Sequence, residues 1–133
     1  MMRATGRFDV KITPQSGDTT AEGPNLGRMS IEKQYQGDLI ASAKGEMLTA
    51  AGLTQKTSAA YSAVERVSGT LHGKHGNFAL QHTGIMTRGT PSLTVTVVPD
   101  SGTSELAGLT GKMDIIIEGK EHTYVFDYEI QPH

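Results

Sequence analysis

Residues 61–86 read YSAVERVSGTLHGKHGNFALQHTGIM and carry the clearest indication of the fold. On both sides of a glycine-flanked turn, apolar residues alternate with polar ones at every second position. A period of two is typical of a β-strand that buries one face. Placing a two-residue turn at Lys74 and His75, between Gly73 and Gly76, predicts a β-hairpin.

The apolar face of this hairpin carries two ionisable residues. In the expected register Val67 pairs with His82 and Glu65 pairs with Gly84, so Glu65 and His82 are diagonal neighbours. The opposite face is polar, and the apolar face is therefore the one that must be buried. The alternation within each strand predicts the same facing even if another turn type shifts the register.

The same alternation continues along the rest of the chain. It predicts eight strands joined by short connections, at about residues 7–14, 29–35, 39–47, 61–71, 77–86, 93–97, 113–118 and 122–130. The first strand is expected to end at Pro14, residues 15–27 to form a loop, and residues 50–58 to form a connection that could hold a short helix. Closure removes exposed strand edges, so we expect a single domain over residues 1–133, an all-β, closed eight-stranded antiparallel meander barrel. A two-sheet β-sandwich is the alternative.

Composition excludes several functional classes. The sequence has no cysteine, which excludes disulfides and cysteine-based zinc sites. It has 12 Lys and Arg against 14 Asp and Glu, a balance that gives no indication of a nucleic-acid partner. The first residues lack an apolar signal segment, and no apolar run has membrane-spanning length. We therefore expect a cytoplasmic protein without a membrane partner.

The candidate site is the polar part of the predicted barrel interior. Buried carboxylates and imidazoles are costly unless they are paired or solvated, so Glu65 and His82 indicate a polar pocket, with Gly69 and Gly84 leaving room nearby. Tyr61 shares the parity of Glu65. The predicted ligand-binding residues are Glu65, His82, Tyr61 and Tyr124, around a small, partly apolar molecule. The simpler alternative is a buried Glu–His hydrogen bond that only fixes the register.

Two other functions are compatible with the same residues. In the first, the protein is an isomerase or cyclase in which Glu65 is the base and His82 its acid partner. In the second, the barrel is a non-catalytic scaffold that forms a homo-oligomer, with a dimer favoured. Its interface would then use outward-facing apolar residues, which include Ile40, Leu48, Val64 and Ile85.

No cofactor or metal is indicated. His72 and His75 have a spacing compatible with a metal, but they flank a turn tip and are expected to be solvated. Lys33 interrupts the apolar face of the second strand. We interpret it as a side chain whose stem is buried while its ammonium reaches water, or as the mark of a β-bulge.

Several segments resemble an uncharacterised bacterial domain family. They are residues 64–71 (VERVSGTL), 76–82 (GNFALQH), 98–111 (VPDSGTSELAGLTG) and 122–124 (HTY), together with Gly37-Asp38-Leu39. The family is a domain of unknown function. The resemblance implies an eight-stranded meander like the barrel of plant allene oxide cyclase, and it implies no activity and no catalytic residues.

Overall fold

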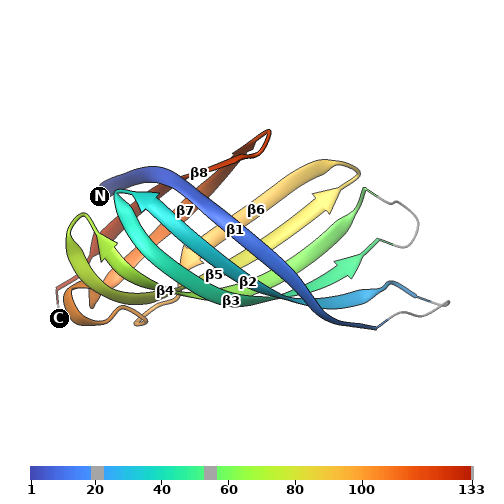
Figure 1. The fold of residues 1–133 in the computed structure, drawn as a ribbon, viewed down its shortest axis with the longest axis horizontal. Helices are drawn as coiled ribbons and strands as arrows, with labels where there is room; N and C mark the ends of the chain where they lie inside the picture. The colour runs from blue at the N-terminus through green and yellow to red at the C-terminus, as the bar shows by residue number, and fades with distance from the viewer. Residues whose placement is uncertain (19–22, 53–56, 133) are drawn as a thin grey trace.

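The computed structural model, which describes residues 1–18, 23–52 and 57–132, is a closed antiparallel β-barrel (Figure 1). Successive strands are neighbours around the barrel, and β8 closes it by pairing with β1 from Met2–Tyr128 to Arg7–Thr123. The elements are β1 (Met2–Asp18), β2 (Leu26–Gly37), β3 (Leu39–Ala51), β4 (Ala59–Leu71), β5 (Lys74–Thr87), β6 (Thr90–Val97), the 3₁₀ helix η1 (Ser104–Leu106), β7 (Leu109–Glu118) and β8 (Glu121–Ile130). The predicted eight-stranded meander is confirmed, and the sandwich is wrong.

The β4–β5 turn differs from the prediction. The turn residues are His72 and Gly73, with Leu71 paired to Lys74, and Val67 pairs with Phe78 instead of His82. Both turn residues have positive φ, 47° and 80°, as a type I′ turn requires. Glycine adopts this conformation without strain, whereas a turn at Lys74-His75 would force two side-chain-bearing residues into it. The register moves by an even number of residues, so the predicted facing is unchanged.

Other strand boundaries also differ from the predicted ones. β1 does not end at Pro14 but continues to Asp18, with a register irregularity between Pro14 and Ser16. A strand tolerates proline at such a bulge because no ladder hydrogen bond is needed there. The expected loop at 15–27 is therefore partly strand, and residues 19–22 lie outside the described residues. In the 50–58 connection β3 runs to Ala51, and the short helix expected there falls on residues 53–56, also outside the described part.

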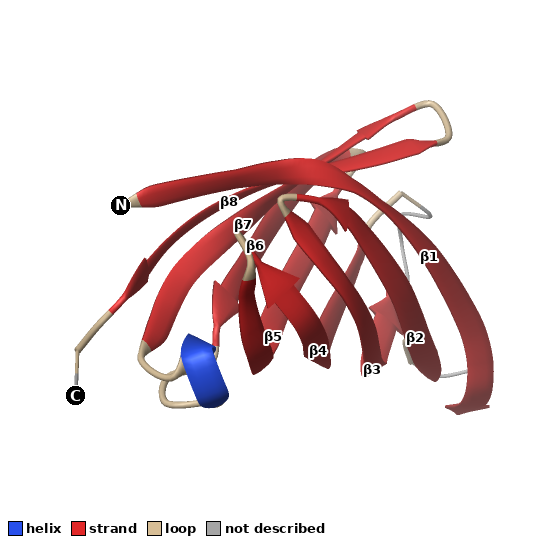
Figure 2. Cartoon of the chain, turned by 60° about the vertical axis from the view of Figure 1, so that its left-hand side comes forward, coloured by secondary structure: helices blue, strands red, loops and turns tan. Residues whose placement is uncertain are grey.

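The two ends of the barrel differ. At one end η1 packs against the strands, where Leu106 is fully buried beside Gly76 (Figure 2). At the other end β6 and β7 diverge toward their hairpin tips (Figure 1). The pairing of β6 with β7 comprises Val95–Met113 and Thr96–Lys112. One end is thus plugged by side chains, and the other opens between β6 and β7.

The core fills the plugged half of the barrel. The Phe78 and Phe126 rings stack with centroids 5.9 Å apart, and Phe126 also contacts Tyr128. Aliphatic side chains from β3 to β7 surround them; they include Leu39, Val67, Leu71, Leu80, Val95, Leu109 and Met113. This packed half leaves the interior near the open end as the place where a ligand could bind.

Candidate functional site

Glu65 is the centre of a buried polar cluster in the barrel wall. Its Oε1 atom accepts hydrogen bonds from the Tyr35 hydroxyl at 2.9 Å and from Lys33 Nζ at 3.1 Å. His82 Nε2 lies 2.8 Å from the same oxygen. An ionised carboxylate only accepts, so this imidazole nitrogen carries the proton. The predicted contact between Glu65 and His82 is present, with Lys33 and Tyr35 as further partners.

Small residues on β3 make this cluster possible. Lys33 and Tyr35 come from β2, whereas Glu65 comes from β4, so their side chains must cross over β3. The inward-facing positions of β3 that they cross are Ala41, Ala43 and Gly45, and Gly45 pairs directly with Glu65. At Gly45 an added Cβ would lie 2.8 Å from Glu65 Cβ, so glycine at this position leaves room for the Glu65 side chain.

The cluster is sealed from water. The side chain of Glu65 is 0% exposed, that of Lys33 5% and that of His82 4%. Among the described residues, Glu65 Oε2 is the buried side-chain polar atom that lacks a hydrogen-bond partner. The lysine stem reaches this position over the Phe8 ring, with Nζ 4.9 Å from the ring centroid. The ammonium of Lys33 therefore lies inside the barrel, paired with Glu65, and neither predicted role for Lys33 is correct.

The pKa of Glu65 reports on the balance of forces in this cluster. Burial raises that pKa, but the His82 hydrogen bond, the Lys33 charge and the Tyr35 hydrogen bond together lower it below its ordinary value of 4.5. The pKa of Tyr35 moves well upward, chiefly because of burial and then because of the Glu65 charge. Glu65 is thus an ionised acceptor and Tyr35 a protonated donor.

We expect the stabilisation by Glu65 to depend on pH in the acidic range. Because the folded-state pKa is below 4.5, this contribution is fully present above about pH 4.5 and is lost as the pH falls through the folded value. Urea unfolding of the wild type and of Glu65→Gln between pH 3 and 7 measures it. The wild-type advantage should be constant near neutral pH and shrink on acidification; an advantage that grows would contradict the assignment.

Tyr61 connects this cluster to the open end. Its ring lies against Gly84, where an added Cβ would be 2.3 Å from Tyr61 Cε1, and its centroid is 6.4 Å from that of His82. The room expected at Gly84 is therefore filled by the tyrosine ring. The room expected at Gly69 is closed as well, because an added Cβ would lie 2.1 Å from the Ile40 carbonyl oxygen.

A cavity of about 320 Å³ lies at the open end, above Tyr61. Its walls are mostly apolar and come from β3 to β7; they include Met47, Tyr61, Met86, Pro91, Leu93 and Ile117. Leu93 and Ile117 face the interior yet are 39% and 62% exposed. Apolar residues on an inner face are normally covered, so their exposure marks the place where the barrel opens.

The cavity does not reach Glu65 or His82. Neither residue is part of its lining, whereas Tyr61 is. The pKa of the Tyr61 hydroxyl is raised by burial and by the Glu65 charge, which keeps that hydroxyl protonated. Of the four predicted ligand-binding residues, the structure brings Glu65, His82 and Tyr61 into one chain of contacts, with Tyr61 alone at the cavity.

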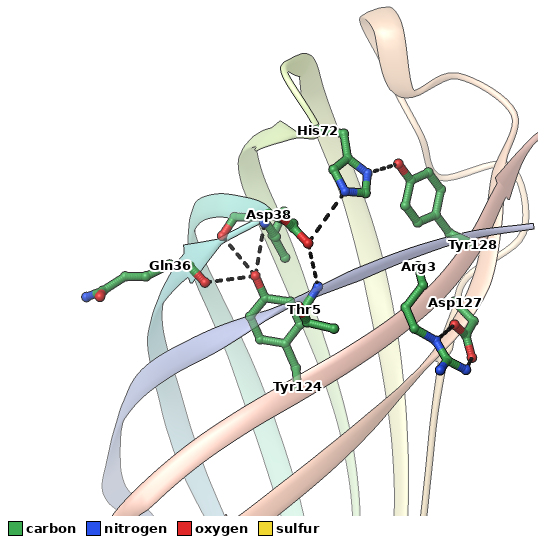
Figure 3. Close-up of polar contacts among 9 residues, drawn as sticks. Arg3, Thr5, Gln36, Asp38, His72, Tyr124, Asp127 and Tyr128 are labelled. Carbon is green, nitrogen blue, oxygen red and sulfur yellow. Dashed lines mark hydrogen bonds and ion pairs between the residues drawn. The ribbon is translucent and has the colours of Figure 1, made fainter.

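Tyr124 is placed elsewhere. Its hydroxyl accepts the Leu39 amide hydrogen bond at 2.9 Å and donates to the Gln36 carbonyl at 2.8 Å (Figure 3). These contacts fasten the β2–β3 turn to β8, at the end of the barrel away from the cavity. Tyr124 faces inward as predicted, but its polar atom is used by the backbone.

A second polar group surrounds the neighbouring turns. His72 lies between the Tyr128 hydroxyl, which contacts Nδ1, and the Asp38 carboxylate, 3.6 Å from Nε2 (Figure 3). Asp38 also accepts the Thr5 amide hydrogen bond at 2.9 Å. This group joins the β2–β3 and β4–β5 turns to β1 and β8.

Sequence reasoning missed Lys33 and Tyr35 as partners of Glu65. The sequence did contain an indication, because Lys33 lies on the same strand face as the buried residues Ile31 and Tyr35. A lysine on a buried face requires a buried carboxylate, and Glu65 was the inward-facing carboxylate already identified.

Within the described ranges there is no group of three or more histidine, aspartate or glutamate side chains arranged to hold a metal ion. The part of the chain that the structure describes also contains no helix long and apolar enough to cross a membrane.

Comparison with known proteins identifies the family. The sequence model of DUF3224, described as a protein of unknown function, matches residues 4–128. A crystal structure of a DUF3224 protein of unknown function from Shewanella oneidensis MR-1 is 48% identical, with a TM-score of 0.93 over 100% of this chain and 99% of that one. No curated protein matches the chain. The likeness to allene oxide cyclase stays a prediction. With nearly its whole length matched, the chain belongs to the bacterial DUF3224 family, whose function is unknown.

Proposed function

We propose that this protein binds a small, partly apolar molecule in the open end of its barrel. The observation that carries the proposal is the cavity of about 320 Å³, whose lining is mostly apolar and includes Leu93 of β6 and Ile117 of β7. Pockets of a few hundred cubic ångströms with apolar walls and few polar groups are typical small-molecule sites. The exposed faces of Leu93 and Ile117 would be buried by such a ligand.

Tyr61 supplies the polar end of the proposed site. It is the residue that both lines the cavity and contacts His82, and its protonated hydroxyl can donate a hydrogen bond. Below it the Lys33–Glu65–His82 cluster forms a rigid floor, because each member is held by another. An aromatic residue with a hydroxyl at the base of an apolar cavity suits a ligand with one acceptor on an otherwise apolar body.

Substitution of Leu93 tests the site. Leu93→Lys places an ammonium in the cavity wall, and we expect it to weaken binding of the neutral fluorophore N-phenyl-1-naphthylamine at least about tenfold. Leu48→Lys is the matched control, because Leu48 faces outward and is 61% exposed. Fluorescence titration of both variants gives the comparison, and loss of binding in Leu48→Lys alone would place the fluorophore outside the barrel.

The acid–base alternative has less support. A general acid or base must come within hydrogen-bond reach of the substrate, and Glu65 and His82 are sealed beneath Tyr61. Their contacts are those of a buried ionic cluster that fixes the interior. The cavity therefore favours binding over the isomerase or cyclase reaction.

The oligomeric scaffold remains a separate prediction. Ile40, Leu48, Val64 and Ile85 face outward as expected and are 50–61% exposed in the single chain. A homodimer that buries them would be detected by sedimentation, and a monomer would remove this explanation for their exposure. A cytoplasmic location belongs to the proposal as well; the absence of cysteines is compatible with it.

A further inference from the structure

The opening between β6 and β7 has two free strand edges. The β5–β6 ladder continues to Thr87–Thr90 and the β7–β8 ladder to Glu118–Glu121, so both hairpins are paired to their tips. By contrast the β6–β7 ladder comprises Val95–Met113 and Thr96–Lys112. The facing edges of residues 90–94 and 114–118 therefore have no strand partner within the described residues.

The hairpin geometry tells which backbone groups face this opening. In a two-residue hairpin the last paired residues exchange both hydrogen bonds, and the direction then alternates along the strand. Thr90 and Glu118 thus bond within their own hairpins. At every odd position the N–H and C=O groups point across the opening, at Leu93 on β6 and at Ile115 and Ile117 on β7. Pro91 offers a carbonyl but no N–H.

These edge residues also face the cavity with their side chains. Leu93 and Ile117 line it, and Ile115 packs against the core beside it. Each therefore presents an apolar side chain to the interior and unpaired backbone groups to the opening. Free backbone edges beside an apolar pocket are the two elements of β-strand addition, in which main-chain hydrogen bonds give affinity and side-chain pockets give specificity.

We propose that an extended peptide segment adds antiparallel to the free edge of β7 and places alternate apolar side chains in the cavity. The inference rests on the proposed function, because the same cavity receives those side chains. β7 is the better edge, since Ile115 and Ile117 both keep an N–H whereas β6 has Pro91.

The outer face of β7 defines the chemistry of the segment further. Asp114 and Glu118 are exposed and point outward beside the free edge. Residues on the outer face of an added strand would lie next to these carboxylates, and opposite charges in that arrangement are favourable. The segment therefore alternates apolar residues, which face the cavity, with basic residues, which face solvent.

A capped heptapeptide of alternating lysine and valine is the probe, and fluorescence anisotropy measures its affinity. In antiparallel addition the residues opposite Ile115 and Ile117 are valines, and their N–H groups point to β7. N-methylation of the valines should weaken binding at least about tenfold, because main-chain hydrogen bonds are lost. N-methylation of the same number of lysine backbone nitrogens keeps charge and apolar content equal to those of the valine-methylated peptide, and it should change affinity by less than about threefold.

The protein side has a matched pair of variants. Ile117→Pro removes an N–H that β8 does not use, whereas Ile117→Val keeps it. We expect only Ile117→Pro to weaken peptide binding, with circular dichroism confirming that both variants are folded. Hydrogen exchange at Ile115 and Ile117 should slow when the unmodified peptide binds.

Equal affinity of the two methylated peptides would overturn the inference, and so would the absence of peptide binding. If N-phenyl-1-naphthylamine still binds in a Leu93-dependent manner, the proposed function survives either result. Methylation-sensitive peptide binding without fluorophore binding would instead support strand addition and reject the small-molecule proposal.

Discussion

Glu65→Gln is expected to lower the free energy of unfolding by about 3–5 kcal/mol, the largest effect of a single substitution that we predict. The amide oxygen can still accept hydrogen bonds from Tyr35 and His82. The loss of stability therefore measures the effect of removing the negative charge of Glu65. What remains is the Lys33 ammonium, 5% exposed and without a counter-charge. Uncompensated buried charge is the reason for the size of the effect.

The double variant Lys33→Met, Glu65→Gln is the control. Removing both charges together should recover much of the stability, because methionine fills a similar volume over Phe8 and leaves no buried ion. Urea denaturation of the wild type, both single variants and the double variant gives the coupling energy. Losses that simply add would show that Lys33 and Glu65 are not coupled, against the 3.1 Å contact.

Tyr124→Phe should lower the free energy of unfolding by about 1–3 kcal/mol. The Tyr124 hydroxyl is the partner of the Leu39 amide and of the Gln36 carbonyl, and phenylalanine leaves both without it. Because the change deletes one oxygen atom, packing against Tyr35 is unchanged, and the loss reports on the turn alone.

Tyr61→Phe is the comparison that separates the two tyrosines. The Tyr61 hydroxyl has no hydrogen-bond partner among the described residues, so we expect Tyr61→Phe to change the free energy of unfolding by no more than about 0.5 kcal/mol. Thermal or urea unfolding of both variants measures the difference. A loss in Tyr61→Phe as large as that in Tyr124→Phe would contradict the placement of Tyr61 at the cavity.

Much of the site could be predicted from alternation. Glu65 and His82 lie on the apolar parity of their strands, and the error in the turn did not matter because the register moved by an even number of residues. Had it moved by an odd number, Glu65 and His82 would have lain on opposite faces of the hairpin. The inward-facing residues could be predicted correctly because they follow from the alternation within each strand. The β4–β5 register, by contrast, depends on the turn, where His72 and Gly73 have positive φ angles.

The partners of each inward residue could not be predicted in the same way. Tyr61 and Tyr124 have equivalent patterns, yet one lines the cavity and the other holds the β2–β3 turn. Their positions along the barrel axis depend on the tilt and stagger of the strands, which no local pattern encodes.

Alternation along the chain is enough to predict the eight strands and the residues that each strand turns inward, because side chains alternate between the two faces of an extended backbone. Three features were visible only in the folded barrel: Lys33 and Tyr35 reach across Ala43 to Glu65, Tyr61 fills the space at Gly84, and β6 and β7 separate. These features depend on contacts between strands that are distant in sequence. Closure of the barrel brings those strands together, and the short ladder between β6 and β7 leaves the opening.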